Sequence, residues 1–263
     1  MKVWKWLNAL AFILTLTLNA LANLLPIGGN TTGEVSARYP TLFTPTPAAF
    51  AVWGVIYLLM AYFVVRQWGA SGKTETGEKL RRAVGVWFFL GCLFNSAWIL
   101  CWHLDKIGLS TVCIAGLLLT LAVTEERLRT RKNVLPDLSL IYAGFDLYFG
   151  WIIAATIANV AVWLKKTGWD GFGKTEVFWT VVMLAAGTLI GTAATLVGSR
   201  RYTGLAVAWA FGGILFRHVS AKGYALAYPA VVAAAGCGTL VLLAVSLFFV
   251  RRPSSGSKAR YRR

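Results

Sequence analysis

The sequence predicts an all-α polytopic membrane protein, and three observations support this fold class. Of the 263 residues, 57% are hydrophobic and 14% are charged, and the mean hydropathy is +0.64. The apolar residues come in blocks of about 20, the length of helix that crosses roughly 30 Å of hydrocarbon. The basic residues, which give a net charge of +16, flank these blocks, where anionic lipid headgroups rather than nucleic acid are the expected partners.

The apolar blocks predict eight membrane-spanning helices. The seventh is the weakest, because only 15 residues separate Arg201 from Arg217 and Gly212-Gly213 could break the helix. In chain order the predicted spans are Trp4–Leu25, Pro47–Val65, Ala83–Trp102, Ile107–Val123, Leu138–Leu164, Val177–Val197, Tyr202–Phe216 and Tyr224–Val250.

The distribution of positive charge favours eight spans over seven. With eight spans and a cytoplasmic N-terminus, 19 of the 26 Lys and Arg lie on the cytoplasmic side. If the seventh block does not cross, this number falls to 15. Since cytoplasmic loops carry an excess of Lys and Arg, we expect both termini inside and the loop between the first two spans outside.

The start of the chain allows two interpretations. A basic beginning, an apolar centre and Ala20-Leu21-Ala22 are typical of a cleavable signal peptide. Asn8, Asn19 and Asn23 instead share one helical stripe, as expected for an uncleaved first helix packed in a bundle. The stripe favours the second interpretation.

Three predicted spans carry a stripe of aromatic and polar residues spaced by three or four, so each stripe lies on one helical face. The stripes are Phe50, Trp53 and Tyr57; Asn95, Trp98 and Trp102; and Tyr148, Trp151, Ala155 and Asn159. They could line a ligand pocket, or they could pack helices together and anchor them at the bilayer surface. Spacing alone does not distinguish a ligand pocket from helix packing and anchoring.

Asp146 lies about two turns inside the fifth span, where a carboxylate is costly and marks either a site or a paired group. Its position favours the ligand-pocket interpretation. The alternative is a protonated acid that is hydrogen-bonded to another helix. The sequence contains no paired carboxylates, HExxH motif or Ser/His/Asp set, so we predict no catalytic residue and no metal site. His103 and His218 end their spans beside charged residues, a poor setting for haem ligation.

At these residues the sequence resembles the TspO/MBR family, the tryptophan-rich sensory and translocator proteins. "YFGWIIAATIAN" is similar to the fifth-helix signature of that family, through Tyr148, Trp151, Ala155 and Asn159. "TPTPAAFAVWGVIY" is similar to the loop and second helix, through Pro45, Trp53 and Tyr57, and "NSAW" to the third helix, through Asn95 and Trp98. The resemblance covers residues 1–165, and the last three spans look like the extension of long bacterial members.

The resemblance implies three parts: a five-helix unit (1–165), a three-helix extension (166–250) and a basic cytoplasmic tail (251–263). It also implies an apolar, Trp-lined cavity that binds a porphyrin or related tetrapyrrole, with no obligatory cofactor. The expected ligand-binding residues are Pro45, Trp53, Tyr57, Asn95, Trp98, Asp146, Tyr148, Trp151, Ala155 and Asn159. Val160 stands where the family's cholesterol-type pattern has tyrosine, so sterol binding is not expected.

The expected function is a receptor or sensor in a bacterial inner membrane, linked to tetrapyrrole or stress metabolism. A homodimer is suggested by the resemblance alone. The alternative is a transporter of small hydrophobic or amphipathic molecules that uses all eight helices. Light-dependent porphyrin breakdown would be a side activity. We further predict that Trp151→Ala and Asn159→Ala weaken ligand binding and leave the bundle folded.

Overall fold

Helices make up all the regular secondary structure in the part of the chain that the structure, a computed structural model, describes: residues 3–25, 27–67, 74–130 and 138–249. The long helices are α1 (Val3–Leu24), α3 (Val52–Arg66), α4 (Thr74–His103), α5 (Ile107–Arg129), α6 (Ser139–Lys166), α7 (Glu176–Gly198), α8 (Arg201–Val219) and α9 (Pro229–Ala244). The shorter elements are α2 (Thr32–Arg38), 3-10 turns at Ile27–Gly29, Pro47–Ala51 and Gly171–Gly173, and a π-helical turn at Val245–Phe249.

Seven of the described helices are long and apolar enough to cross a membrane, which confirms a polytopic all-α membrane protein. They are the predicted spans except the seventh, which corresponds to α8. α8 is more polar than the other long helices of the second half, yet its 19 residues form one unbroken helix of about 28 Å. The candidate break at Gly212-Gly213 is absent, because the helix continues through both glycines. The last helix starts at Pro229 rather than Tyr224, since proline suits the first turn of a helix.

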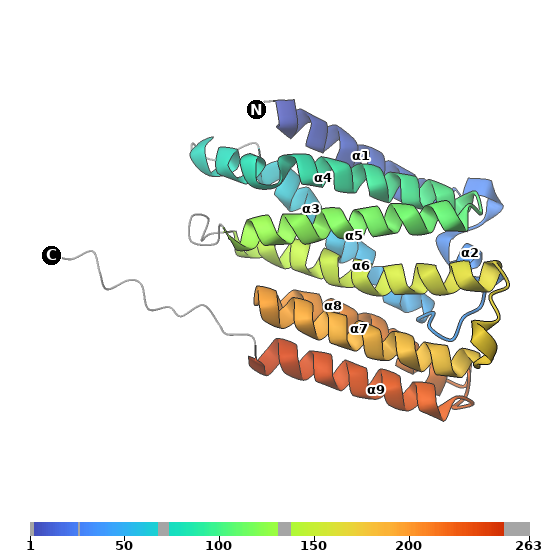
Figure 1. The fold of residues 1–263 in the computed structure, drawn as a ribbon. Coiled ribbons are helices and arrows are strands. Elements are labelled where there is room, and N and C mark those ends of the chain that lie inside the picture. Colours follow the sequence, from blue (N-terminus) through green and yellow to red (C-terminus); the bar gives the residue numbers. More distant parts are fainter. Residues whose placement is uncertain (1–2, 26, 68–73, 131–137, 250–263) are drawn as a thin grey trace.

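Figure 1 shows the long helices side by side, with α1, α4, α5 and α6 stacked above α7 and α9. α4 packs between α1 and α5, and α6 packs against α5, α3 and α8. α8 packs in turn against α7 and α9. The contact of α6 with α8 therefore joins the first five long helices to the last three.

Glycines allow α8 to lie close to its neighbours. A Cβ at Gly150 of α6 would collide with the backbone carbonyl of Thr203, and a Cβ at Gly204 would collide with Ser246. The Thr203 hydroxyl also donates a hydrogen bond to the carbonyl oxygen of Asp146, at 3.1 Å. Small residues at such crossings let helices pack closely in a membrane. α8 is thus an interior helix, which explains its low hydropathy.

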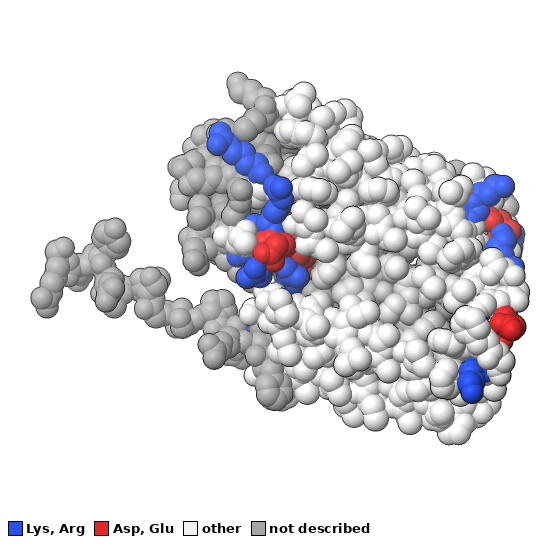
Figure 2. Space-filling view, viewed as in Figure 1, with Lys and Arg blue, Asp and Glu red and all other residues white. Residues whose placement is uncertain are grey.

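Charged residues lie at the two ends of the bundle, with a broad uncharged band between them on the face that Figure 2 shows. The start of α1 and the end of α9 share one end, whereas α2 lies at the other (Figure 1). We call the latter the α2 end. The positive-inside rule predicts that this end faces outward. The basic tail predicted at 251–263 lies outside the described residues.

α1 is connected to the rest of the bundle by hydrogen bonds. The Thr15 hydroxyl is bonded to the carbonyl oxygen of Cys92 at 3.1 Å and to the hydroxyl of Ser96 at 3.0 Å, both on α4. The side-chain amide of Asn19 donates to Asn95 at 2.9 Å. Asn8 donates to Gln67, after α3, at 2.7 Å. The side chain of Asn23 lies outside the described part.

A buried ion pair also connects the first five long helices to the extension. The guanidinium Nε of Arg200, between α7 and α8, lies 3.1 Å from a carboxylate oxygen of Glu125 on α5. Their side chains are 10% and 4% exposed, so the pair is largely removed from water. Removing one partner of such a pair is strongly destabilising, because it leaves an uncompensated buried charge. The two expected units are therefore closely packed against each other.

Candidate ligand-binding cavity

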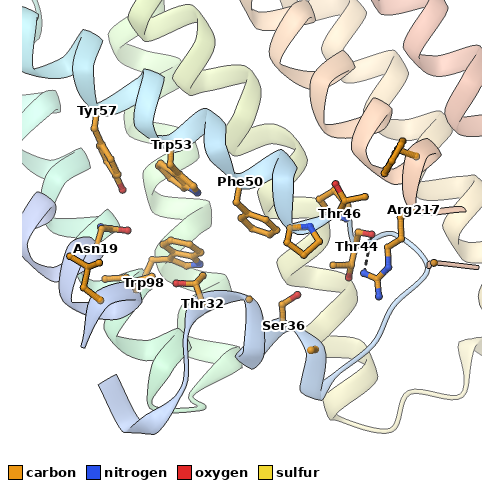
Figure 3. Close-up of a pocket in the computed structure, with 18 of the residues that line it drawn as sticks. Asn19, Thr32, Ser36, Thr44, Thr46, Phe50, Trp53, Tyr57, Trp98 and Arg217 are labelled. Carbon is orange, nitrogen blue, oxygen red and sulfur yellow. Dashed lines mark hydrogen bonds between the residues drawn. The ribbon is translucent and has the colours of Figure 1, made fainter. Parts of the chain in front are cut away.

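A cavity of about 1000 Å³ lies at the α2 end and is called the outer cavity here. Its walls come from the second half of α1, α2, the segment that leads into α3, the first half of α3, α4, and the end of α8 with the turn that follows (Figure 3). The expected residues Pro45, Trp53, Tyr57 and Trp98 line it. Other lining residues, which were not among the expected ligand-binding residues, include Leu16, Asn19, Ser36, Phe50, Phe216 and Arg217.

One wall is residues 42–49, called the lip segment, and α8 holds it in place. Four bonds run between the two: Thr46 N donates to Gly213 O (3.2 Å), Trp209 Nε1 to Ala49 O (2.8 Å) and Arg217 Nη1 to Thr44 O (3.2 Å), while His218 Nε2 lies 2.9 Å from Leu42 O. Loop carbonyls that would otherwise lack partners are satisfied in this way. The extension therefore shapes the cavity.

The wall opposite the aromatic side chains is α2, which begins with a capping box. Thr31 accepts a bond from the backbone of Glu34, and the Glu34 carboxylate accepts one from the backbone of Thr31 at 2.6 Å. The end of α4 fixes the helix, because Trp102 Nε1 donates to the Thr32 carbonyl at 3.2 Å and His103 is bonded to the Thr32 hydroxyl at 3.1 Å.

The other end of α2 is fixed through Asp105, in the turn between α4 and α5. The hydroxyl of Tyr39 lies 3.1 Å from both carboxylate oxygens, and Lys166 Nζ lies 2.6 Å from one of them. Burial alone would raise the pKa of Asp105, but the bonds from Lys166 and Tyr39 outweigh it and lower that pKa below its ordinary value.

Trp53 is the centre of the aromatic wall. Its ring is stacked near Tyr57 and Trp98, with ring centroids 5.3 and 5.9 Å apart. Tyr148 and Trp151 meet it edge to face, at 5.8 and 6.2 Å. The three helical stripes thus converge on one indole, and the rings that line the cavity present apolar faces on which a flat molecule could stack.

A smaller space, called the inner chamber, continues behind Phe50 and Trp53 toward α6 and α8. It has a volume of about 50 Å³ and shares Pro45, Phe50, Trp53 and Trp98 with the outer cavity. Trp151, Ala155 and Asn159 line it, together with other small residues of α6. Phe50 lies edge to face on Trp151, with centroids 5.8 Å apart, at the boundary between the two spaces.

Two buried donors at these spaces have no hydrogen-bond partner in the described part of the chain. They are the hydroxyl of Tyr57, which lines the outer cavity, and the indole nitrogen of Trp151, which lines the inner chamber. An unsatisfied buried polar group costs about 1–3 kcal/mol, and native proteins contain few. The two donors are therefore places where a bound molecule could present oxygen or nitrogen atoms.

Asn95 and Tyr148 stand behind the aromatic wall rather than in either lining. The amide of Asn95 donates to the Tyr148 hydroxyl at 2.7 Å and accepts a bond from Asn19 at 2.9 Å. α1, α4 and α6 are joined by these bonds. Of the three side chains, only that of Asn19 lines the outer cavity.

Asn159 lines the inner chamber, but its side chain is already engaged by two helices. Its oxygen accepts bonds from Trp98 Nε1 at 2.8 Å and from the Ser110 hydroxyl at 2.9 Å. Its nitrogen donates to the Thr111 hydroxyl at 2.8 Å. The direct role of Asn159 is thus to orient the indole of Trp98, which does face the cavity.

Asp146 lines neither space. The residue is 7% exposed, and its backbone carbonyl accepts the bond from Thr203 at the crossing of α6 with α8. The structure therefore brings seven of the ten expected residues to the two spaces, places Asn95 and Tyr148 directly behind them, and separates Asp146 from them.

The charge of the outer cavity is positive. Among its lining residues the charged side chains are those of Arg217 and Lys222, from the end of α8 and the turn after it. No acid is among the lining residues. Sequence reasoning missed both cations, because the contact of α8 with the lip segment joins positions far apart in the chain.

Comparison with known proteins gives one match. A family model described as TSPO-like protein matches residues 5–248 and so includes the three-helix extension as well as the five-helix unit. No curated protein and no solved structure matches the chain.

Proposed function

The chain belongs to the TSPO-like family, and from this membership and the geometry of the outer cavity we propose that it is a membrane receptor for a flat, tetrapyrrole-like ligand such as a porphyrin. The observation that carries the proposal is the aromatic wall centred on Trp53, which borders a space of about 1000 Å³. That volume is at the upper end of the roughly 300–1,000 Å³ that small-molecule pockets occupy.

The chemistry of the walls fits such a ligand. Indole faces can stack on a macrocycle, and the unpartnered hydroxyl of Tyr57 can address its polar edge. The basic residues Arg217 and Lys222 add charge to one part of the lining. The other lining groups do not include a nucleophile paired with a base, so binding, not turnover, is the function that the site supports.

Discontinuous helices often form the binding sites of transporters, and Gly212-Gly213 was the candidate break in this chain. α8 is continuous through Gly212 and Gly213, and the lip segment is bonded to it at four positions. These contacts favour a fixed pocket and hence a receptor.

The test is a titration of the detergent-purified protein with protoporphyrin IX, followed by the shift of the porphyrin absorbance band. We expect saturable binding near one ligand per chain, weakened about tenfold or more by Trp53→Ala, because stacking and apolar contact are lost. Trp179→Ala is the matched control, since Trp179 lies outside both spaces. Linear uptake, or equal binding by wild type and Trp53→Ala, would show partitioning without a site and reject the proposal.

A further inference from the structure

The basic end of the outer cavity lies away from its aromatic end. Figure 3 shows Tyr57, Trp53, Phe50, Thr46 and Arg217 in sequence along the cavity, with the guanidinium at the far side from Tyr57. A ligand that stacks on Trp53 and extends past Phe50 would therefore bring its other edge toward Arg217.

Arg217 is held in a fixed position, and most of its guanidinium N–H donors make no hydrogen bond within the described chain. Its guanidinium donates one bond, to the Thr44 carbonyl, and lies over the ring of Tyr224 at 5.2 Å from the centroid. Among the described residues the Thr44 bond is its one hydrogen bond, although a guanidinium carries five N–H donors. The free edge has the planar geometry that binds a carboxylate through two parallel bonds.

The described acids at the α2 end are engaged elsewhere. Asp105 pairs with Lys166, and Glu176 pairs with Lys165 and accepts a bond from Leu42 N. Glu34 belongs to the capping box of α2, and Asp170 accepts a bond from Phe172 N. None of these carboxylates is an ion-pair partner of Arg217 or Lys222, so two positive charges in the cavity lining stay uncompensated within the described protein.

We propose that Arg217 and Lys222 form an anion subsite in the outer cavity, which binds a carboxylate of the ligand. The inference rests on the proposed function and narrows its ligand to amphipathic acids that have a flat apolar body and an anionic edge. It also gives the three-helix extension a role, because both basic residues belong to it. The extension supplies the group that distinguishes acids from neutral molecules of the same shape.

The test compares protoporphyrin IX with its dimethyl ester, which keeps the ring and lacks the charges. In phosphatidylcholine nanodiscs we expect wild-type protein to bind the diacid at least tenfold more tightly than the ester. Arg217→Gln should remove most of this preference; because it also removes the bond to Thr44 of the lip segment, the readout is the ratio of diacid to ester affinity within each variant. Lys222→Gln, at an exposed position, should reduce the preference about two- to fivefold.

Two controls keep the result specific. Arg217→Lys retains the charge without the planar fork and should retain part of the preference. Lys174→Gln removes a positive charge at the same end but outside the outer cavity, and it should change neither affinity. If Arg217→Gln also weakens ester binding, Lys222→Gln tests the subsite instead, because Lys222 is not part of the lip segment. A diacid preference that is unchanged in Lys222→Gln would then overturn the subsite.

Failure of the anion subsite and failure of the receptor proposal would give different results. Saturable ester binding equal to that of the diacid would overturn the anion subsite and leave the receptor proposal standing. Absence of saturable binding of either compound would reject both. A diacid preference in phosphatidylcholine that phosphatidylglycerol abolishes would still support the subsite and would show that a lipid phosphate competes for it. A preference that is equal in wild type and Arg217→Gln would overturn the carboxylate assignment.

Discussion

Tyr57 and Tyr148 are two tyrosines of one aromatic cluster whose hydroxyls differ in one respect. The Tyr148 hydroxyl accepts a bond from Asn95 at 2.7 Å, whereas the Tyr57 hydroxyl is buried without a partner in the described chain. Tyr148→Phe should therefore lower the free energy of unfolding by about 1–2 kcal/mol, because the amide of Asn95 loses its acceptor. Tyr57→Phe should leave stability unchanged or raise it, because it removes a buried hydroxyl without a partner, and it should weaken porphyrin binding. Thermal unfolding and porphyrin titration of both variants check this; equal stability losses would contradict the assigned partners.

Asn159 illustrates how the structure changes a prediction made from the sequence. Its three side-chain bonds mean that Asn159→Ala leaves the donors of Trp98 and Ser110 without their acceptor. We expect a loss of about 2–4 kcal/mol in stability together with weaker binding, because the indole of Trp98 is no longer oriented. Thr156→Ala, on the same helix, removes only a bond to the helix's own backbone and is the control. An Asn159→Ala protein as stable as this control would contradict the network.

At the residue level the sequence predicted which aromatic side chains share a helical face, but not how the polar ones are used. Spacings of three and four place Trp53, Trp98 and Trp151 on helical faces, and apolar bundles bring such faces together. The partner of a buried amide depends on the register between helices, which a single stripe does not specify. Asn159 and Asn95 therefore stood as ligand groups in the sequence and bond to protein in the structure.

Among the elements, α8 carries the sharpest test of how the cavity is built. A Cβ at Gly213 would lie 2.8 Å from Ala49 Cβ and 3.0 Å from Pro45 Cβ, whereas one at Gly212 would meet nothing within 4 Å. Gly213→Ala should push the lip segment away from α8, lower stability by about 1–3 kcal/mol and weaken ligand binding. Gly212→Ala should be neutral or slightly stabilising, since alanine is the better helix former. Similar behaviour of the two variants would show that α8 does not support the lip.

The attachment of α2 predicts a dependence on pH. Because the folded-state pKa of Asp105 is lowered, its stabilisation is fully present above the unfolded pKa of about 3.9 and is lost as pH falls through the lower folded value. With the side chain 39% exposed, the contribution is at most about 1 kcal/mol. The pKa of Glu34 is lowered too, mainly by the bond from the Thr31 backbone, so wild type alone does not isolate Asp105.

A comparison of wild type with Asp105→Asn isolates the contribution of the Asp105 carboxylate, because asparagine tolerates the positive φ of 57° at this position. The stability difference between wild type and this variant should be constant well above the unfolded pKa of about 3.9 and should shrink as the pH falls below it. Denaturation in detergent at several pH values measures it. A difference that does not change with pH would mean that the carboxylate is not what holds Tyr39 and Lys166.

The elements themselves were largely predictable, since long apolar runs with flanking charges leave few choices. α8 was the uncertain one because hydropathy reports contact with lipid, whereas α8 is covered by α6, α7 and α9 and is rich in Gly and Ala. Its packing depends on Gly150 of a distant helix, which no local pattern shows.

Across the whole molecule, the last three helices are part of one structure with the first five. The α6–α8 crossing, the Glu125–Arg200 ion pair and the bonds from α8 to the lip segment are all contacts between the two. The family match over residues 5–248 agrees with this continuity. The site could therefore be only partly predicted from the five-helix resemblance, because one wall of the cavity belongs to the extension.

The most direct test of the central claim is to fill the outer cavity without removing any contact. Gly33 of α2 lines the cavity and Gly54 of α3 does not, and an added Cβ meets nothing within 4 Å at either. The measurement is the stoichiometry of protoporphyrin IX bound by Gly33→Trp and by Gly54→Trp. We predict that the first binds no ligand at saturation and that the second binds as wild type does. Full binding by a folded Gly33→Trp protein would contradict the claim that the ligand occupies this cavity.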